Sequence, residues 1–435
     1  MLSISSRFDQ ISDVLGKSAG AVCIRGWVYR KRSSGGKAFV VIRDRTGTVQ
    51  CVVDKAKVKD QEWEQLDSAY LESSIMVRGS IRADSRAPGG VELDVSELSV
   101  VHSGEQFPIT EYQSPEFLLD VRHLWLRSQR MIKAMEARAH IMRYTRRFLD
   151  RNGFFEVNAP ILTKAGGETG ANLFEVDYFG QKAYLTESSQ LYAEAMIYSL
   201  EKVYSFAPTF RAEKSRTTKH LIEFWMLEPE MAYFNNAQNM RFQEKFISYL
   251  ATSLAKEHSD DILSFFGVSG ESLMNIRPPF KRLSYEQAID ILNQKGSKKK
   301  WGDDFGVEEE RLLTEGEEKP VFVHSWPKEI KAFYMPVNPK DDRTVLNADM
   351  LAPNGHGEIV GGSERIWKLD ELLQRMKEAG LNTENYRWYI DLRRYGSVPH
   401  SGFGSGIERV IKWLLNLDHI KDAIPFPRLI NRVEP

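Results

Sequence analysis

Two arginines far apart in the chain are each presented by a short, rigid element. Arg211 lies in FRAEKSRTTKHLIEFWMLEPE, residues 210–230, where charged side chains precede an apolar, strand-like stretch. Arg409 ends the glycine-rich turn GFGSGIER, residues 402–409, and opens an apolar helix. A guanidinium offers parallel donors that match phosphate oxygens. The pair therefore indicates a polyphosphate that is held at both ends.

A second candidate site is a pair of carboxylates around a glycine-rich hairpin. Asp349 and Glu358 lie in NADMLAPNGHGEIVGG, residues 347–362. Mg²⁺ takes hard oxygen ligands and keeps several waters, so one or two carboxylates plus substrate phosphates are sufficient to hold it. These residues predict a magnesium site beside the polyphosphate. Solvated acidic residues near a turn are the plain alternative.

Composition limits the class of protein. The chain has 435 residues, of which 42% are hydrophobic, and its net charge is −1. The length predicts two domains, and the composition is that of an ordinary globular protein. Residues 21–45 nevertheless carry seven basic side chains against Asp44 alone, a local excess of +6. This segment fits either a nucleic-acid contact or a solvated face of a small barrel.

Targeting and redox features are sparse. The sequence has no apolar leader at MLSISSRFDQ and no apolar run of membrane-spanning length. Cys23 and Cys51 lack the spacing of a metal site or a redox motif, and they suit a reducing compartment. We therefore expect a cytoplasmic protein with no membrane partner.

The N-terminal part is rich in short strands. Residues 21–102 contain five strand-like runs separated by turns, with a helical segment near Asp60–Tyr70. Five strands with an inserted helix predict an OB-fold barrel, and the SH3-like alternative lacks that helix. We assign residues 1–102 to this domain, 103–130 to a linker and 131–435 to a second domain.

The second domain is predicted to open with an amphipathic helix over Met131–Arg151, which ends at Asn152 and Gly153. Later strands follow one another without regular helical crossovers, which favours an antiparallel sheet flanked by helices and an α+β class. We expect residues 293–319 to be a solvated insertion. The expected strands include 202–210, 224–234, 321–326, 331–335 and 389–396.

Three segments resemble the signature motifs of class II aminoacyl-tRNA synthetases. GFFEVNAPILT, residues 153–163, is similar to motif 1, and FRAE with the EFWMLEPE strand is similar to motif 2. GFGSGIER is similar to motif 3. Three motifs in the family's order form a specific signal. The N-terminal OB domain is typical of class IIb, which serves aspartate, asparagine and lysine.

The resemblance implies that ATP and Mg²⁺ are used. It implies that Arg211 holds the α-phosphate and Arg409 the γ-phosphate, with Glu358 as the third catalytic residue. A fixed guanidinium would stabilise the negative charge that develops when a carboxylate attacks the α-phosphorus. The implied ATP-binding residues are Arg211, Glu213, Lys219, His220, Leu221, Glu358, Gly406 and Arg409, and the implied metal ligands are Asp349 and Glu358.

The resemblance also places the amino acid. The loop GGETGA, residues 166–171, is similar to a loop that closes over the substrate, where Glu168 would contact the α-ammonium group close to Gln190. Glu228 and Arg365 would face the substrate side chain. The implied amino-acid-binding residues are Glu168, Gln190, Arg211, Glu228, Gly361 and Arg365.

Three positions favour asparagine over aspartate. Ala193 stands where aspartate enzymes of the family carry lysine, and Glu228 stands where they carry a shorter aspartate. Glu228 can accept from an amide NH₂ and Arg365 can donate to the amide oxygen. The chain thus resembles the compact asparaginyl-tRNA synthetases of archaea, with L-asparagine and tRNA(Asn) as substrates. An aspartyl enzyme, including one that charges both tRNAs, an asparagine-making paralogue and a non-catalytic tRNA-binding module are the alternatives.

Two further expectations concern macromolecular contacts. Phe39 and Gln50 match family positions that hold the middle uridine of the anticodon by stacking and hydrogen bonding, and Arg25 is a weaker candidate. A core aromatic is the alternative for Phe39. The helix and strand of residues 131–163 carry more apolar surface than a solvated segment needs, which predicts a homodimer.

Overall fold

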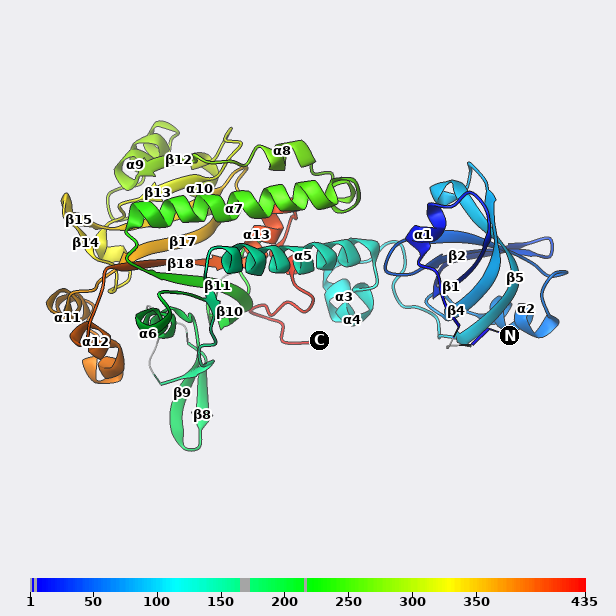
Figure 1. Ribbon diagram of the computed structural model, residues 1–435, viewed down its shortest axis with the longest axis horizontal. Helices are drawn as coiled ribbons and strands as arrows, with labels where there is room; N and C mark the ends of the chain where they lie inside the picture. The colour runs from blue at the N-terminus through cyan, green and yellow to red at the C-terminus, as the bar shows by residue number, and fades with distance from the viewer. Residues whose placement is uncertain (1, 4–5, 165–172, 215–216) are drawn as a thin grey trace. The chain divides into compact units, whose positions relative to one another are not determined.

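A computed structural model describes residues 2–3, 6–164, 173–214 and 217–435. It consists of two compact units, Met1–Leu119 and Asp120–Pro435, each with its own hydrophobic core (Figure 1). The division falls inside the segment 103–130 that the sequence predicts as a linker. Arg122, from that segment, is buried in the larger unit, where it donates to the carbonyls of Lys421 and Pro425 at 2.8 Å.

The smaller unit is a closed five-stranded barrel, in the order β1-β2-β3-β5-β4. Its strands alternate inward apolar residues with outward polar ones, as a barrel wall requires. The predicted OB-fold with its inserted helix is confirmed. The elements are α1 Ile11–Leu15, β1 Ala21–Ser34, β2 Lys37–Arg43, β3 Thr48–Asp54, α2 Asp60–Ser68, β4 Ser74–Ala83, a 3₁₀ turn Pro88–Gly90 and β5 Val91–His102.

An eight-stranded sheet forms the larger unit, in the order β12-β13-β16-β17-β18-β11-β10-β6. The predicted antiparallel sheet is confirmed for its central strands, whereas the edge pairs β12–β13 and β10–β6 are parallel. The strands are β6 Phe155–Glu156, β10 Lys202–Phe210, β11 Glu223–Ala232, β12 Lys281–Ser284, β13 Val321–His324, β16 Asn347–Ala352, β17 Gly357–Arg365 and β18 His400–Gly406.

Two smaller sheets and a set of helices complete this unit. The small sheets are β7 Leu162–Thr163 with β9 Gln181–Leu185 and β8 Glu175–Tyr178, and β14 Val337–Asn338 with β15 Asp341–Val345. The helices are α3 Pro115–Asp120, which spans the division, α4 Arg122–Trp125, α5 Gln129–Arg151, α6 Gln190–Leu200, α7 Asn236–His258, α8 Gly270–Met274, α9 Tyr285–Gln294, α10 Val307–Leu313, α11 Leu369–Glu378, α12 Arg387–Arg394 and α13 Ile407–Leu414, with short turns at Ser259–Leu263, Lys328–Ile330, Thr383–Tyr386 and Ile420–Ala423.

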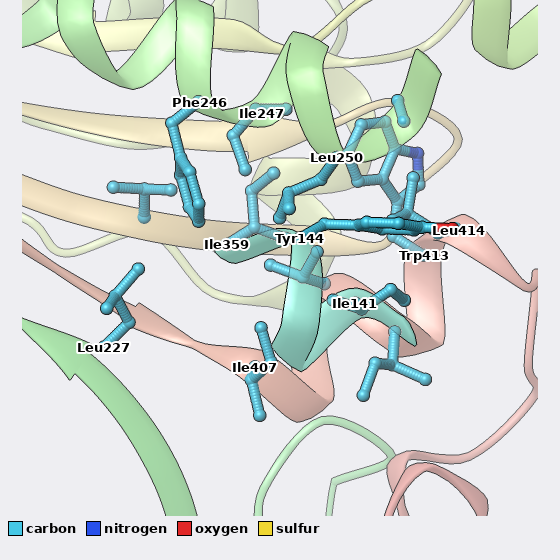
Figure 2. Packing of buried hydrophobic residues seen from close by; sticks show 14 of the residues in the cluster. Ile141, Tyr144, Leu227, Phe246, Ile247, Leu250, Ile359, Ile407, Trp413 and Leu414 are labelled. Atoms are coloured by element: carbon cyan, nitrogen blue, oxygen red, sulfur yellow. The ribbon is translucent and has the colours of Figure 1, made fainter. Parts of the chain in front are cut away.

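The main core lies between the large sheet and the long helices α5 and α7. Figure 2 shows α7 residues Phe246 and Leu250 packed above Tyr144 of α5, with Leu227 of β11 and Ile407 of α13 below. Each long helix has a side-chain N-cap, and burial of one face supplies the rest of its stability. No helix among the described residues is long and apolar enough to cross a membrane.

Two predicted strands are wrong. Residues 331–335 follow a 3₁₀ turn as irregular chain, in which Phe333 and Tyr334 pack into a satellite core with Tyr389. Residues 389–396 lie mostly in α12, because Tyr389, Ile390 and Arg393 are buried on one helical face. Short runs of this kind carry too few residues to separate a period of 2 from one of 3.6.

The segment 293–319 is not simply a solvated insertion, as the sequence predicts. It contains α10, and it buries Phe305 and Leu313 in a second satellite core. Glu310 of α10 is also buried, and it pairs with Lys219, which lines the candidate site described below. A segment dense in charge therefore supplies core residues and a partner for a site residue.

Candidate active site

A cavity with a volume of about 280 Å³ lies over the central strands of the large sheet. A strand sends alternate side chains to opposite faces, so β11 contributes side chains to the cavity on one face and to the core on the other. Leu227 and Met231 of β11 pack in the core. The β11 residues that line the cavity are Phe224, Met226, Glu228 and Glu230.

Most residues predicted from the sequence meet in this cavity. Glu168 lies outside the described residues, and Arg25, Phe39 and Gln50 belong to the smaller unit. The thirteen that line the cavity are Gln190, Arg211, Glu213, Lys219, His220, Leu221, Glu228, Asp349, Glu358, Gly361, Arg365, Gly406 and Arg409.

Arg211 directly follows β10, where the sheet holds its backbone. Its amide donates to the carbonyl of Ile222 at 3.0 Å, and its guanidinium lies over the ring of Phe224, 5.6 Å from the centroid. Stacking of this kind fixes the plane of a guanidinium. Arg211 therefore enters the cavity with a defined orientation.

Arg409 lies in the first turn of α13. Its Nη1 donates to the backbone oxygen of Glu358 at 3.2 Å, which aims the side chain into the cavity. An ion pair between Arg409 and the adjacent Glu408 is not what holds it. The buried carboxylate of Glu408 instead accepts from Arg138 of α5 at 2.7 Å and from the Trp225 amide at 3.1 Å. This contact anchors α13 to α5 and to β11.

Asp349 and Glu358 converge over a position without a side chain. A Cβ placed on Gly361 would lie 2.9 Å from Glu358 Oε1 and 3.6 Å from Asp349 Oδ1. Burial and the Glu358 charge raise the pKa of Asp349 to about 6, although Lys331 Nζ lies 2.6 Å from Asp349 Oδ2 and opposes that shift. Burial also disfavours the Glu358 anion, but Arg409 and Lys331 outweigh it and lower the pKa of Glu358.

A cluster of charges surrounds the nucleotide end predicted from motif 2. Lys219 forms an ion pair with Glu310 of α10, whose pKa is raised by burial. His220 is half-buried, and burial together with the Arg409 charge lowers its pKa to about 4. His220 is therefore neutral at physiological pH, and it adds no positive charge beside the two arginines.

At the opposite end of the cavity, two glutamates of β11 are held by different partners. Glu228 accepts from the Ser188 hydroxyl and, at 2.7 Å, from the Ser189 amide. Glu230 pairs with Arg365, whose Nη2 and Nε lie 2.6 and 3.3 Å from the two carboxylate oxygens. Burial raises the pKa of Glu230 to about 8, with Arg365 opposing the shift.

Gln190, the first residue of α6, joins this end to a buried polar network. Its Nε2 donates to Glu194 Oε1 at 3.0 Å. Glu194 also accepts from the Tyr389 hydroxyl at 2.8 Å and pairs with Arg393 and His400. Burial opposes ionisation of Glu194, but its cationic partners lower its pKa overall. The network fixes where α6 presents Gln190.

Several site residues are absent from the predictions. Glu230 could have been found, because it is two residues from Glu228 and a strand places both on one face. Lys331 was assigned to a strand that does not exist, and no sequence signal connects Glu310 to Lys219. Ala193 is buried with Ile197 and Val203 in a small apolar cluster, and it does not line the cavity.

The outer wall of the barrel carries the residues predicted to contact nucleic acid. Phe39 alternates with buried neighbours and is itself half-buried, with the Arg32 guanidinium 4.8 Å from its ring centroid. Gln50 lies on the adjacent strand and donates to Glu92 at 2.9 Å. Arg25 is exposed beside Phe8, 5.0 Å from its ring centroid.

Comparison with family models matches both units. Residues 114–430 match the model of class II tRNA synthetases (D, K and N), and residues 22–101 match that of an OB-fold nucleic acid binding domain. Curated relatives include the asparagine–tRNA ligases of Thermoplasma acidophilum and Thermococcus gammatolerans, which are 46% and 48% identical, each over 95% of this chain and 96% of theirs. The chain belongs to the asparagine–tRNA ligase family of class II tRNA synthetases.

Solved structures agree with this assignment. The asparaginyl-tRNA synthetase from Pyrococcus horikoshii complexed with asparaginyl-adenylate is 46% identical, with a TM-score of 0.95 over 99% of this chain and 100% of that one. The synthetase from Entamoeba histolytica complexed with asparaginyl-adenylate is 32% identical, with a TM-score of 0.87 over 99% of this chain and 100% of that one. An aspartyl enzyme from the same organism is 24% identical and shows the shared fold alone.

The Glu230–Arg365 pair generates a stability prediction. Arg365→Met leaves a buried carboxylate without its cation and should cost about 3–5 kcal/mol of unfolding free energy, whereas the double variant Arg365→Met with Glu230→Met should recover much of it. Without Arg365 the folded pKa of Glu230 rises further above about 8, so the loss of stability relative to the unaltered chain should grow as pH rises above about 8. Denaturant unfolding at several pH values measures both effects. A double variant no more stable than the single one would contradict this account.

Proposed function

We propose that this chain attaches L-asparagine to tRNA(Asn) at the expense of ATP, through an asparaginyl-adenylate. The observation that carries the proposal is the convergence in one cavity of thirteen residues assigned to ATP, the metal ion and the amino acid. The similarity to a synthetase complexed with asparaginyl-adenylate over nearly the whole chain supports it.

In the first step a carboxylate oxygen of asparagine bonds to the α-phosphorus of ATP and pyrophosphate leaves. In the second, a tRNA hydroxyl attacks the activated carbonyl and AMP leaves.

The nucleotide end of the cavity suits this first step. Arg211 would hold the α-phosphate, where negative charge develops, and Arg409 would hold the γ-phosphate. Because Phe224 and the Glu358 carbonyl already orient these guanidiniums, little reorganisation accompanies the reaction. The residues assigned to the rest of the nucleotide are Glu213, Lys219, His220, Leu221 and Gly406.

Asp349 and Glu358 fit a magnesium ion that accompanies ATP. Their carboxylates converge over Gly361, and hard oxygen donors of this kind suit Mg²⁺. Lys331 pairs with Asp349, so its ammonium would share that carboxylate with the ion. When bound, Mg²⁺ would neutralise phosphate charge. The two carboxylates would position it, and Lys331 would add positive charge nearby.

The amino-acid end suits an amide better than a carboxylate. Ser188 and the Ser189 amide hold Glu228 in place, so its carboxylate can accept from an amide NH₂. The Arg365 guanidinium is shared with Glu230, so its charge is not wholly available to a substrate carboxylate. An aspartate side chain would therefore meet Glu228 as a like charge. Gln190 and Glu168 are assigned to the α-ammonium group.

The alternatives are less well supported. An aspartyl enzyme would need a cation available to the substrate carboxylate, and the guanidinium of Arg365 in the cavity is already paired with Glu230. A non-catalytic tRNA-binding module would not need Arg211, Glu358 and Arg409 in one cavity. A paralogue that makes asparagine would not need an anticodon-binding barrel.

The barrel, residues 1–102, is proposed to bind the anticodon of tRNA(Asn). Phe39 supplies a half-exposed ring on which a base can stack, and Gln50 supplies a polar edge on the neighbouring strand. Part of the predicted basic patch is engaged within the barrel. Lys31 donates to three carbonyls at the end of α2, and Arg43 pairs with Glu72. The Arg25 side chain is exposed.

A homodimer in the cytoplasm is proposed as the working form. Helix α5 has less apolar surface for a partner than the sequence predicts, because Met131, Ile141 and Tyr144 are buried against their own chain. Better support comes from the following segment, where Phe155, Ile161 and Leu162 are 55%, 41% and 43% exposed. Sedimentation of the full chain at micromolar concentration should give twice the chain mass of 49.9 kDa, and a monomer would contradict the proposal.

The activation step provides the first functional prediction. ATP–pyrophosphate exchange should require L-asparagine and Mg²⁺. Arg211→Ala or Arg409→Ala should each lower the rate by about 10²–10³-fold, since each removes a donor to charge in the transition state. Arg151→Ala, at an exposed arginine that ends α5, is the control and should exchange normally. Normal exchange by Arg211→Ala would remove that residue from the catalytic set.

The barrel provides the second functional prediction. Phe39→Ala should weaken tRNA(Asn) binding by about 1–3 kcal/mol through lost stacking, and it should leave ATP–pyrophosphate exchange unchanged. Tyr70→Ala, at a half-exposed aromatic of the same unit, is the matched control. The comparison of charging kinetics with exchange kinetics separates the two steps. Equal loss in both assays would mean that Phe39 acts through the fold.

A further inference from the structure

The helices α5 and α7 bring three metal-ligand side chains together away from the cavity. The two helices lie side by side (Figure 1). His140 belongs to α5, Glu257 and His258 end α7, and the rings of His140 and His258 are in contact. One ligand atom from each lies within 4.8 Å of the other two, and no other group of three or more His, Cys, Asp or Glu residues in the described part of the chain comes together in this way. None of the three lines the cavity assigned to ATP and the amino acid.

The two imidazoles face each other at a distance that suits one ion. His140 Nδ1 and His258 Nε2 are 3.1 Å apart, with ring centroids 3.9 Å apart. Two nitrogens bound to a tetrahedral Zn²⁺ at about 2.0–2.1 Å would be separated by roughly 3.3 Å. The two nitrogens are already close to that separation, but ligation along both lone pairs would set the ring centroids roughly 5 Å apart, so the imidazoles have to turn apart by about 1 Å when the ion enters. A hydrogen bond between the rings is the competing arrangement, and it requires a proton on one of these nitrogens.

A neighbouring carboxylate favours the form of His258 that can bind a metal. His258 Nδ1 lies 3.4 Å from the Asp261 carboxylate. Donation of the Nδ1 proton toward Asp261 leaves a lone pair on Nε2, which faces His140. This arrangement of carboxylate, histidine and metal is the usual way in which proteins orient an imidazole ligand.

The backbone explains how two consecutive residues reach one point. Successive side chains of a regular α-helix diverge by about 100°. His258 leaves helical geometry, with φ −140° and ψ 27°, and a π-helical turn follows over Ser259–Leu263. The break turns the His258 ring back toward α5, on the side of Glu257. Single π turns inside or after helices occur frequently at functional sites.

The surrounding charges permit a divalent cation. Glu257 and Asp261 contribute two carboxylates, against Arg143 and Arg147. Arg143 Nη2 lies 3.5 Å from His140 Nδ1 and Arg147 Nη1 lies 3.6 Å from Glu257 Oε1. Both arginines are exposed, so they can swing into solvent when an ion binds. The Tyr144 hydroxyl donates to Glu257 Oε2 at 2.7 Å and leaves the other oxygen for coordination.

We propose that His140, Glu257 and His258 form a site for a borderline transition-metal ion such as Zn²⁺, with water as the fourth ligand. Two imidazoles and one carboxylate suit Zn²⁺, Co²⁺ or Ni²⁺, whereas Mg²⁺ and Ca²⁺ require oxygen ligands. The bound ion bridges the end of α7 and the middle of α5. Because these helices cover the back of the active-site sheet, its role is structural support at a distance from the reaction.

Titration of the chelator-treated full chain with Zn²⁺ tests the proposal. Calorimetry should show one ion per chain, with a raised melting temperature, and Mg²⁺ should give no binding at this site. His140→Asn and His258→Asn should abolish the binding, and Asp261→Asn should weaken it by roughly 10–100-fold. His123→Asn, at an exposed histidine of α4, is the matched control and should bind as the unaltered chain does.

Co²⁺ provides a readout that does not depend on the variants. Bound to the unaltered chain, it should give the intense visible absorption of a four-coordinate ion, and Zn²⁺ should displace it. Any one of three results would overturn the site. These are the weak spectrum of hydrated Co²⁺, less than one Zn²⁺ bound per chain at saturation, and normal Zn²⁺ binding by His140→Asn.

Discussion

The candidate active site depends on which face of β11 each residue occupies. Glu228 and Glu230 face the cavity because Leu227 and Met231 are drawn into the core beneath α5 and α7. A shift of one residue in register would exchange the two sets, so burial of the apolar residues specifies the position of the acidic ones. The hydrophobic core therefore determines the chemistry of the opposite face.

Contacts between elements then fix the positions of the other cavity residues relative to β11. The buried carboxylate of Glu408 joins Arg138 of α5 to the backbone of Trp225 in β11, and this anchors the helix that presents Arg409. At the other end Arg365 of β17 pairs with Glu230 across β18, where a Cβ on Gly402 would overlap the carboxylate. Glycine is required there because the ion pair occupies its side-chain space. The shape of the cavity is thus held by ion pairs that involve residues of its own wall.

The sequence predicts the parts of this site that are local. The glycine-rich turns, the order of three motifs and the apolar alternation of β11 place Arg211, Glu358 and Arg409 on the correct elements, and the barrel follows from its strand spacing. Contacts made only by the tertiary fold are absent from such patterns. Lys331 meets Asp349 from irregular chain, and Glu310 meets Lys219 from a segment whose charge suggests full solvation. The helix at 387–394 is missed for a related reason, since its short apolar stripe becomes decisive only when it packs on residues 333–334.

The central claim is that charge at the amino-acid end of the cavity selects asparagine. Asparagine and aspartate are nearly isosteric, so a difference in shape cannot separate them, whereas a buried carboxylate beside Glu228 is costly. An uncompensated charge of this kind costs about 3–5 kcal/mol, which corresponds to roughly 10²–10³-fold or more in selectivity. Parallel measurement of kcat/KM for ATP–pyrophosphate exchange with L-asparagine and with L-aspartate tests this directly. The account predicts a preference for asparagine of at least about 10²-fold, and equal values for the two amino acids would contradict it.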